Sequence, residues 1–129
     1  MLKVALGGLA IALGVLAAPA AAAPPTTHLV VFNRPGPNFA RAADLRDAAL
    51  AHQALYRRLA AEGKIVAGGR MEGEPALGLS VFAPDIDPQE MRRLLTEDLA
   101  VKAGLVAIEF RDWQLQMGSL TASDADRDG

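Results

Sequence analysis

The segment "THLVVFNRPGPN" (Thr27 to Asn38) decides the fold class, because apolar residues fill every position from Leu29 to Phe32 before the chain breaks. Successive side chains of a strand point to opposite faces of the sheet, so this pattern predicts a strand that is covered on both faces. We therefore expect it to be central in its sheet. The "PGPN" that follows ends the strand, since its prolines and glycine favour a turn.

Two helices are predicted after this strand. From about Ala40 to Glu62 apolar residues recur at helical spacing, and Gly63 suits the left-handed end of a helix. The sequence "DPQE", which begins at Asp87, supplies an N-cap acid, a proline for the first helical position and a capping-box glutamate. The second helix is expected to end at Gly104, with an inner stripe of Met91, Leu94, Leu95, Leu99 and Val101 or Lys102.

Three further strands are predicted: "KIVAGGRM" and "ALGLSVF", joined by the turn "EGEP", and a last strand "LVAIEFRDWQLQM". The last strand changes phase, because its apolar residues are even-numbered up to Phe110 and odd-numbered from Trp113. A slip of one residue turns every side chain to the opposite face, so we expect a β-bulge near Arg111 or Asp112.

The order strand, helix, strand, strand, helix, strand predicts an α+β fold of the βαββαβ, ferredoxin-like type, with an antiparallel sheet and two helices on one face. Two helices leave the other face of a four-stranded sheet uncovered. Several strands have apolar residues at both odd-numbered and even-numbered positions, so this second face would be apolar as well. We expect a homodimer that packs sheet against sheet.

The two ends of the chain are expected to lie outside this domain, which spans residues 27–118. Residues 1–23 carry Lys3, an apolar run to about Leu16 and then small residues, which is the pattern of a secretory signal peptide. The run of about 13 residues is shorter than the roughly 18 that a membrane span needs. We expect a periplasmic or secreted protein with no stable membrane anchor after cleavage. Residues 119–129 are expected to form a disordered tail.

Composition excludes several classes of function. After loss of Lys3 the chain has 12 basic and 15 acidic residues and no basic cluster, so nucleic acid is not an expected partner. The chain has no cysteine and cannot form disulfides. No metal-ligand spacing, phosphate-binding glycine loop or Ser/His/Asp signature occurs, and we expect neither a metal nor another cofactor.

Two polar residues interrupt the predicted inner faces of the helices. His52 lies among Ala48, Ala49, Leu55 and Tyr56, and Asp98 lies on the inner stripe of the second helix. A buried carboxylate needs a partner, so the two side chains are predicted to meet and to form an acid/base pair. Two other interpretations stay open: His52 as a structural residue satisfied in the core, and Asp98 as the N-cap of a restarted turn in "TEDLAVKAG".

Other polar or small residues give weaker signals. The Tyr56 hydroxyl could reach the same cleft as His52, or Tyr56 could be a core residue. Gly68 and Gly69 could let a ligand approach the backbone, or could mark a bulge or tight packing. His28 is expected at the surface. The arginines at positions 57, 58, 92 and 93 are interpreted as solvated helix faces, and Trp113 and Met117 as sheet or dimer packing.

The segments "LRDAALAHQALYRRLAAEGKIVAGG" and "EDLAVKAGLV" resemble the YCII-related domain family of the dimeric α+β barrel fold. The first is similar to the family's helix with an inward histidine before a glycine-paired strand, and the second to its aspartate-containing helix end. The resemblance covers about residues 27–118. It implies that His52 and Asp98 correspond to the family's paired active-site residues, in a cleft between helices and sheet. Family members usually have proline after the aspartate, where this chain has Leu99.

The leading functional hypothesis is a cofactor-independent enzyme, of lyase or isomerase type, in which neutral His52 takes a proton and Asp98 orients the imidazole ring. Relatives in the wider fold imply a small cyclic or aromatic compound as the ligand. The alternative is a non-catalytic periplasmic module that binds a small ligand or serves as a structural dimer. A third hypothesis is heme binding through a histidine, which nothing else in the sequence favours.

Overall fold

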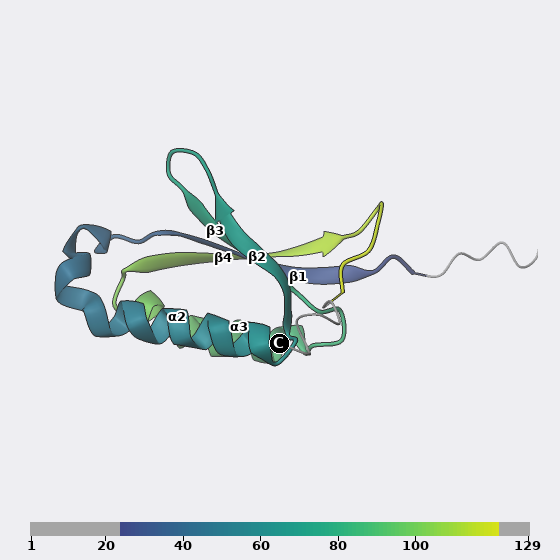
Figure 1. Ribbon diagram of the computed structural model, residues 1–129, viewed down its shortest axis with the longest axis horizontal. Helices are drawn as coiled ribbons and strands as arrows, with labels where there is room; N and C mark the ends of the chain where they lie inside the picture. The colour runs from purple at the N-terminus through teal and green to yellow at the C-terminus, as the bar shows by residue number, and fades with distance from the viewer. Residues whose placement is uncertain (1–23, 122–129) are drawn as a thin grey trace, which may run out of the picture.

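The computed structural model describes residues 24–121. Its four strands form one antiparallel sheet in the order β2-β3-β1-β4, and the long helices lie on one side of it (Figure 1), which is the α+β, ferredoxin-like arrangement that the sequence predicts. The elements are β1 (Thr27–Pro35), the 3-10 helix η2 (Phe39–Leu45), α2 (Arg46–Ala61), β2 (Ile65–Met71), β3 (Leu77–Phe82), α3 (Pro88–Thr96), α4 (Leu99–Lys102) and β4 (Val106–Gln114).

Both predicted terminal segments fall largely outside this range. The predicted signal peptide, residues 1–23, lies outside the described residues, as do residues 122–129 of the predicted tail. Residues 119–121 have no regular secondary structure. Among residues 24–121, no helix combines the length and the hydrophobicity that a membrane crossing requires.

The first strand is central, as predicted. β1 pairs with β3 on one side and with β4 on the other, and Leu29, Val30 and Val31 are all buried. Alternate residues point to the two faces, and Leu29 and Val31 point toward the helices. There they pack with Phe82 of β3, Leu59 of α2, and Met91 and Leu95 of α3. Each such side chain contributes about 1.5–3 kcal/mol when fully buried.

The helix boundaries follow from capping groups. Asp87 accepts hydrogen bonds from the backbone N–H groups of Gln89 at 3.0 Å and Glu90 at 3.3 Å, so α3 begins where the sequence predicts. The Glu90 carboxylate pairs with Arg93 at 2.6 Å instead of closing the capping box. Gly63 and Gly104 have φ values of +76° and +74°, which is the left-handed conformation expected after a helix.

The second helix is not continuous, which corrects the predicted inner stripe. α3 ends at Thr96, Asp98 takes an extended conformation, and α4 begins at Leu99. The break restarts the helical phase. Leu99, which a continuous helix would bury, is 57% exposed for this reason. The first helix is also shorter than predicted, because its start forms η2, which contains a kink at Arg41.

The predicted bulge near Arg111 or Asp112 is wrong. β1 and β4 pair without a register shift from Thr27 opposite Gln114 to Pro35 opposite Val106. The change in apolar phase reflects two faces that both carry apolar residues: Phe110 packs on the helix side and Trp113 lies on the other. The register shift occurs in β2, between Ile65 and Ala67.

His28 is buried, although the sequence suggested a surface position. Its side chain is inaccessible to solvent, and its Nδ1 donates a hydrogen bond to the backbone oxygen of Phe82 at 2.6 Å. The ring lies beside Trp113, with 6.5 Å between the ring centroids. This residue therefore ties the start of β1 to the end of β3.

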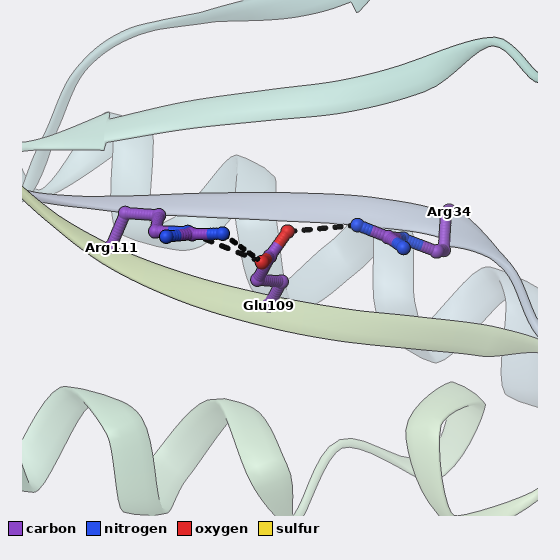
Figure 2. A network of polar contacts seen from close by, with 3 residues as sticks. All are labelled: Arg34, Glu109 and Arg111. Carbon is purple, nitrogen blue, oxygen red and sulfur yellow. Dashed lines mark hydrogen bonds and ion pairs between the residues drawn. The ribbon is translucent and has the colours of Figure 1, made fainter.

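The face of the sheet opposite the helices is largely apolar. Val30 and Val81 are buried at its centre, and Phe32, Leu77 and Leu79 are half-buried around them. A row of charges crosses the β1–β4 side of this face: Glu109 accepts from Arg34 at 2.8 Å and from Arg111 at 2.7 Å (Figure 2). The residues on this face surround a groove of about 540 Å³.

Candidate functional site

His52 and Asp98 meet across the interior. His52 projects from α2, Asp98 stands between α3 and α4, and Nδ1 of the imidazole lies 2.5 Å from Oδ2 of the carboxylate. The Asp98 side chain is 2% exposed, whereas that of His52 is 20% exposed. The contact between the two side chains is the one that the sequence predicts. The carboxylate of the pair is therefore buried, and the imidazole is partly accessible to solvent.

The two oxygens of Asp98 have different roles. Oδ2 accepts from His52, and Oδ1 accepts from the backbone N–H of Ala100 at 3.3 Å, which caps α4. The pairing and the N-cap, which the sequence left as alternatives, occur together. Because the start of a helix holds the carboxylate, its position does not depend on the histidine alone.

The contact determines which nitrogen of His52 carries the proton. A carboxylate only accepts hydrogen bonds, so Nδ1 must be the donor and Nε2 of the neutral ring carries the lone pair. Nε2 has no hydrogen-bond partner among the described residues, and it is not among their solvent-inaccessible polar atoms. The pair therefore presents a basic nitrogen on the side away from Asp98.

Tyr56 lies one helical turn after His52 and packs against its ring. The two ring centroids are 4.6 Å apart and the planes are tilted by 43°. Burial raises the pKa of Tyr56 to about 12, the nearby Asn33 side chain opposes the shift, and the charge of Asp98 adds to it. The Tyr56 hydroxyl is inaccessible to solvent and has no hydrogen-bond partner among the described residues, so burial is the decisive cause. Tyr56 stays protonated at neutral pH.

A cleft of about 420 Å³ opens between α2 and the β2–β3 edge of the sheet. Four residues named from the sequence line it together: His52, Tyr56, Gly68 and Gly69. Asp98 lies behind His52 and does not line the cleft. The other lining residues are Gln53, Arg57, Ala60, Ile65, Leu79 and Ser80. A larger groove of about 540 Å³ beside Glu62 and Glu90 has no histidine among its described residues, so we regard the smaller cleft as the better candidate.

The two glycines of β2 differ in how closely their surroundings pack. A Cβ on Gly68 would lie 3.1 Å from the backbone oxygen of Leu79, so tight packing favours glycine there. A Cβ on Gly69 would meet nothing within 4 Å, and packing gives no reason for that glycine. Both residues are exposed and belong to an edge strand, so their backbone is accessible from the cleft.

Two residues of the cleft are not among the site residues that the sequence predicts. Arg57, interpreted as part of a solvated face, is exposed but borders the cleft, and Ser80 is a buried hydroxyl residue on its floor. A signal for Arg57 was present, because His52, Gln53, Tyr56 and Arg57 form two adjacent pairs with a spacing of four residues. Such pairs lie on neighbouring stripes of one helical surface.

Comparison with family models, curated proteins and solved structures gives no match for this chain. Within residues 24–121, no group of three or more His, Cys, Asp or Glu side chains is placed to hold a metal ion.

Tyr56 is the only tyrosine of the chain, so the ultraviolet absorbance of phenolate reports this hydroxyl alone. We expect a titration midpoint near 12 in the folded protein, against an ordinary value of 10 after unfolding in urea. The raised pKa contributes stability that is fully present below pH 10 and is lost as the pH rises toward 12. Asp98→Asn should lower the midpoint by removing a negative charge. Phenolate that forms near pH 10 while circular dichroism is still native would contradict the burial argument.

Leu99→Pro should preserve the fold and raise the free energy of unfolding by about 0.4–1 kcal/mol. Leu99 is the first residue of α4, its N–H donates no bond to the described residues, and Asp98 before it has the extended conformation that proline favours (φ −54°, ψ 134°). Lys102→Pro is the matched control, because the N–H of Lys102 donates to the backbone carbonyl oxygen of Asp98 at 3.0 Å. The Lys102→Pro variant should lower the free energy of unfolding, measured in urea, by about 3 kcal/mol. Equal losses in both variants would refute the helix restart at Leu99.

Proposed function

We propose that this protein is a cofactor-independent acid/base enzyme that acts on a small cyclic or aromatic compound. Nε2 of His52 takes a proton from the substrate, and Asp98 holds the ring in the required tautomer. The observation that carries the proposal is the 2.5 Å contact between Nδ1 and the buried carboxylate, with the other ring nitrogen left unpaired beside a cleft. This is the geometry of a base oriented by a carboxylate.

The environment of the pair suits proton transfer. When His52 accepts a proton, the imidazolium forms against an ionised carboxylate 2.5 Å away, which stabilises the new charge. The same proton can return to another atom of the substrate. The cycle then balances as an isomerisation, or as a lyase reaction when a leaving group departs, and it needs no redox partner.

The exposure of His52 favours catalysis over a purely structural role. A structural role permits full burial, whereas a catalytic role requires access, and the His52 side chain keeps 20% of its surface exposed and borders the cleft. A second candidate function is a binding module without catalysis. The N-cap bond that the Asp98 carboxylate accepts from the backbone N–H of Ala100 favours it, because that bond gives the aspartate a structural role unrelated to catalysis.

The resemblance to YCII-related proteins supports the same site. The helix with His52, the strand with Gly68 and Gly69, and the turn with Asp98 carry the resemblance in the sequence, and all three border or support one cleft. We therefore propose that the chain is a member of that family. The N-terminal segment, with its short apolar run, supports export to the periplasm or beyond.

We also propose that the protein is a homodimer in which the open faces of two sheets pack together, as in a dimeric α+β barrel. Phe32, Leu77 and Leu79 would form the centre of an isologous contact. The row of Arg34, Glu109 and Arg111 carries one excess positive charge. Its side chains are between 36% and 67% exposed, which suits a solvated rim.

The test of catalysis is hydrogen exchange in D₂O, followed by NMR, on a panel of cyclic lactones and enolisable cyclic ketones, each with and without a carboxylate substituent. The wild type should incorporate deuterium into at least one compound. His52→Ala should slow exchange by about 10²-fold or more, since a general base contributes about that much. Asp98→Asn should slow it less. Arg58→Gln, on the solvated side of α2, is the control and should have no effect. Exchange that persists in His52→Ala, or no exchange at all, would favour the binding module.

The dimer is tested by analytical ultracentrifugation. Phe32→Glu should convert the protein to a monomer, because two like charges would face each other in an apolar contact. Leu50→Glu is the matched control, since Leu50 is a large apolar residue that is 52% exposed on α2. That variant should stay dimeric. A wild-type monomer at micromolar concentration, or dissociation of both variants, would reject the proposed interface.

A further inference from the structure

The electrostatic character of the cleft points to the class of substrate. Among the described residues that line it, Arg57 alone carries a permanent charge. The nearest site carboxylate, Asp98, is buried behind His52 and both of its oxygens are engaged. An anionic ligand entering the cleft therefore meets one unopposed cation and no exposed carboxylate.

Arg57 has no acidic partner within residues 24–121, which is also true of Arg41, Arg46 and Arg70, but of these four arginines only Arg57 lines the cleft. Arg58, its neighbour in sequence, lies 3.7 Å from Glu62, and Arg93 pairs with Glu90 at 2.6 Å. Arg92 pairs with Asp112 at 3.1 Å. A guanidinium presents donors in a planar fork that matches a carboxylate, and the fork of Arg57 is not used by the fold.

The separation of Arg57 and His52 along α2 is compatible with a small ligand. The two residues are five positions apart on α2, which corresponds to a rise of about 7.5 Å along the helix axis. A small ring that carries a carboxylate on one side and an acidic C–H on the other spans a distance of this order. The cleft volume of about 420 Å³ is sufficient for such a molecule.

The opposite wall can supply hydrogen bonds to the same ligand. β2 is an edge strand, and in an edge strand alternate residues direct their N–H and C=O groups away from the sheet. One of the adjacent residues Gly68 and Gly69 must therefore present backbone groups outward. Ser80 lies next to them, with its Oγ 3.7 Å from the position that a Cβ on Gly68 would occupy.

We propose that the substrate is a small cyclic carboxylate and that Arg57 binds its carboxylate group while His52 faces the reacting C–H. The inference rests on the proposed function for the role of His52. The recognition of an anion by Arg57 depends only on the charge and shape of the cleft. Arg57 is a binding residue, and His52 is the catalytic residue.

The test compares two ligands of nearly equal shape, benzoate and benzamide. Binding to the full protein is followed by the NMR shifts of the ¹⁵N-labelled His52 ring. Benzoate should bind at millimolar concentration and benzamide at least about fivefold more weakly, because a charge-assisted bond is about twice as strong as a neutral one. Arg57→Gln should remove this preference. Arg57→Lys, which keeps the charge but not the fork, should retain part of it, and the matched variant Arg58→Gln should retain all of it.

Each contrary result has a definite meaning. Equal binding of benzoate and benzamide, no binding of benzoate, or an equal loss in Arg57→Gln and Arg58→Gln would overturn the inference. Deuterium exchange that depends on His52 and is as fast for a neutral cyclic ketone as for the same ring with a carboxylate would overturn it as well and leave the proposed enzyme intact. Selective benzoate binding together with exchange that does not need His52 would preserve anion recognition and reject the enzyme.

Discussion

The buried carboxylate of Asp98 is the constraint on which the rest of this structure depends. A carboxylate that is 2% exposed must be compensated by hydrogen bonds, since an isolated buried charge is very costly. Both of its oxygens are compensated, one by Ala100 and one by His52. The first bond breaks the second helix and starts α4. The second fixes the ring of His52, and with it the direction of the unpaired Nε2.

The position of this carboxylate also explains why the cleft lies between α2 and the edge of the sheet. His52 is held by Asp98 at the α3–α4 break, and the cleft that His52 lines opens between α2 and the β2–β3 edge of the sheet. There, glycines at positions 68 and 69 keep β2 free of side-chain bulk. Tyr56 packs against the ring and is itself half-buried, with a pKa raised to about 12 by burial. The ring of His52 is therefore held by its hydrogen bond and by this packing.

The sequence was sufficient for those features that depend on local chemistry or on strict periodicity. Asp87 and Gly63 mark helix boundaries because capping and left-handed geometry are decided by the residue itself. The centrality of β1 follows from apolar residues at consecutive positions. Whether β4 contains a bulge could not be predicted from periodicity alone. A strand whose even-numbered apolar residues lie on one face and whose odd-numbered apolar residues lie on the other produces the same pattern as a register slip. Only the pairing with the neighbouring strand distinguishes the two. His28 was misplaced because its burial depends on Phe82, which lies 54 residues away.

The contact between His52 and Asp98 was predicted partly for a reason that the structure corrects. Asp98 was placed inward on the assumption of one continuous helix, yet it is inward because the helix stops and restarts around it. The unpaired positive charge of Arg57 in the cleft, in contrast, could have been predicted from the residues at helical spacing around it. Arg58 has Glu62 four residues later, whereas Arg57 has Gln53 and Ala61 at that spacing and alanines three residues away on either side. A helical arginine without an acid at these positions has no local ion-pair partner, and a fold that brings no distant acid to it leaves its charge available for a ligand.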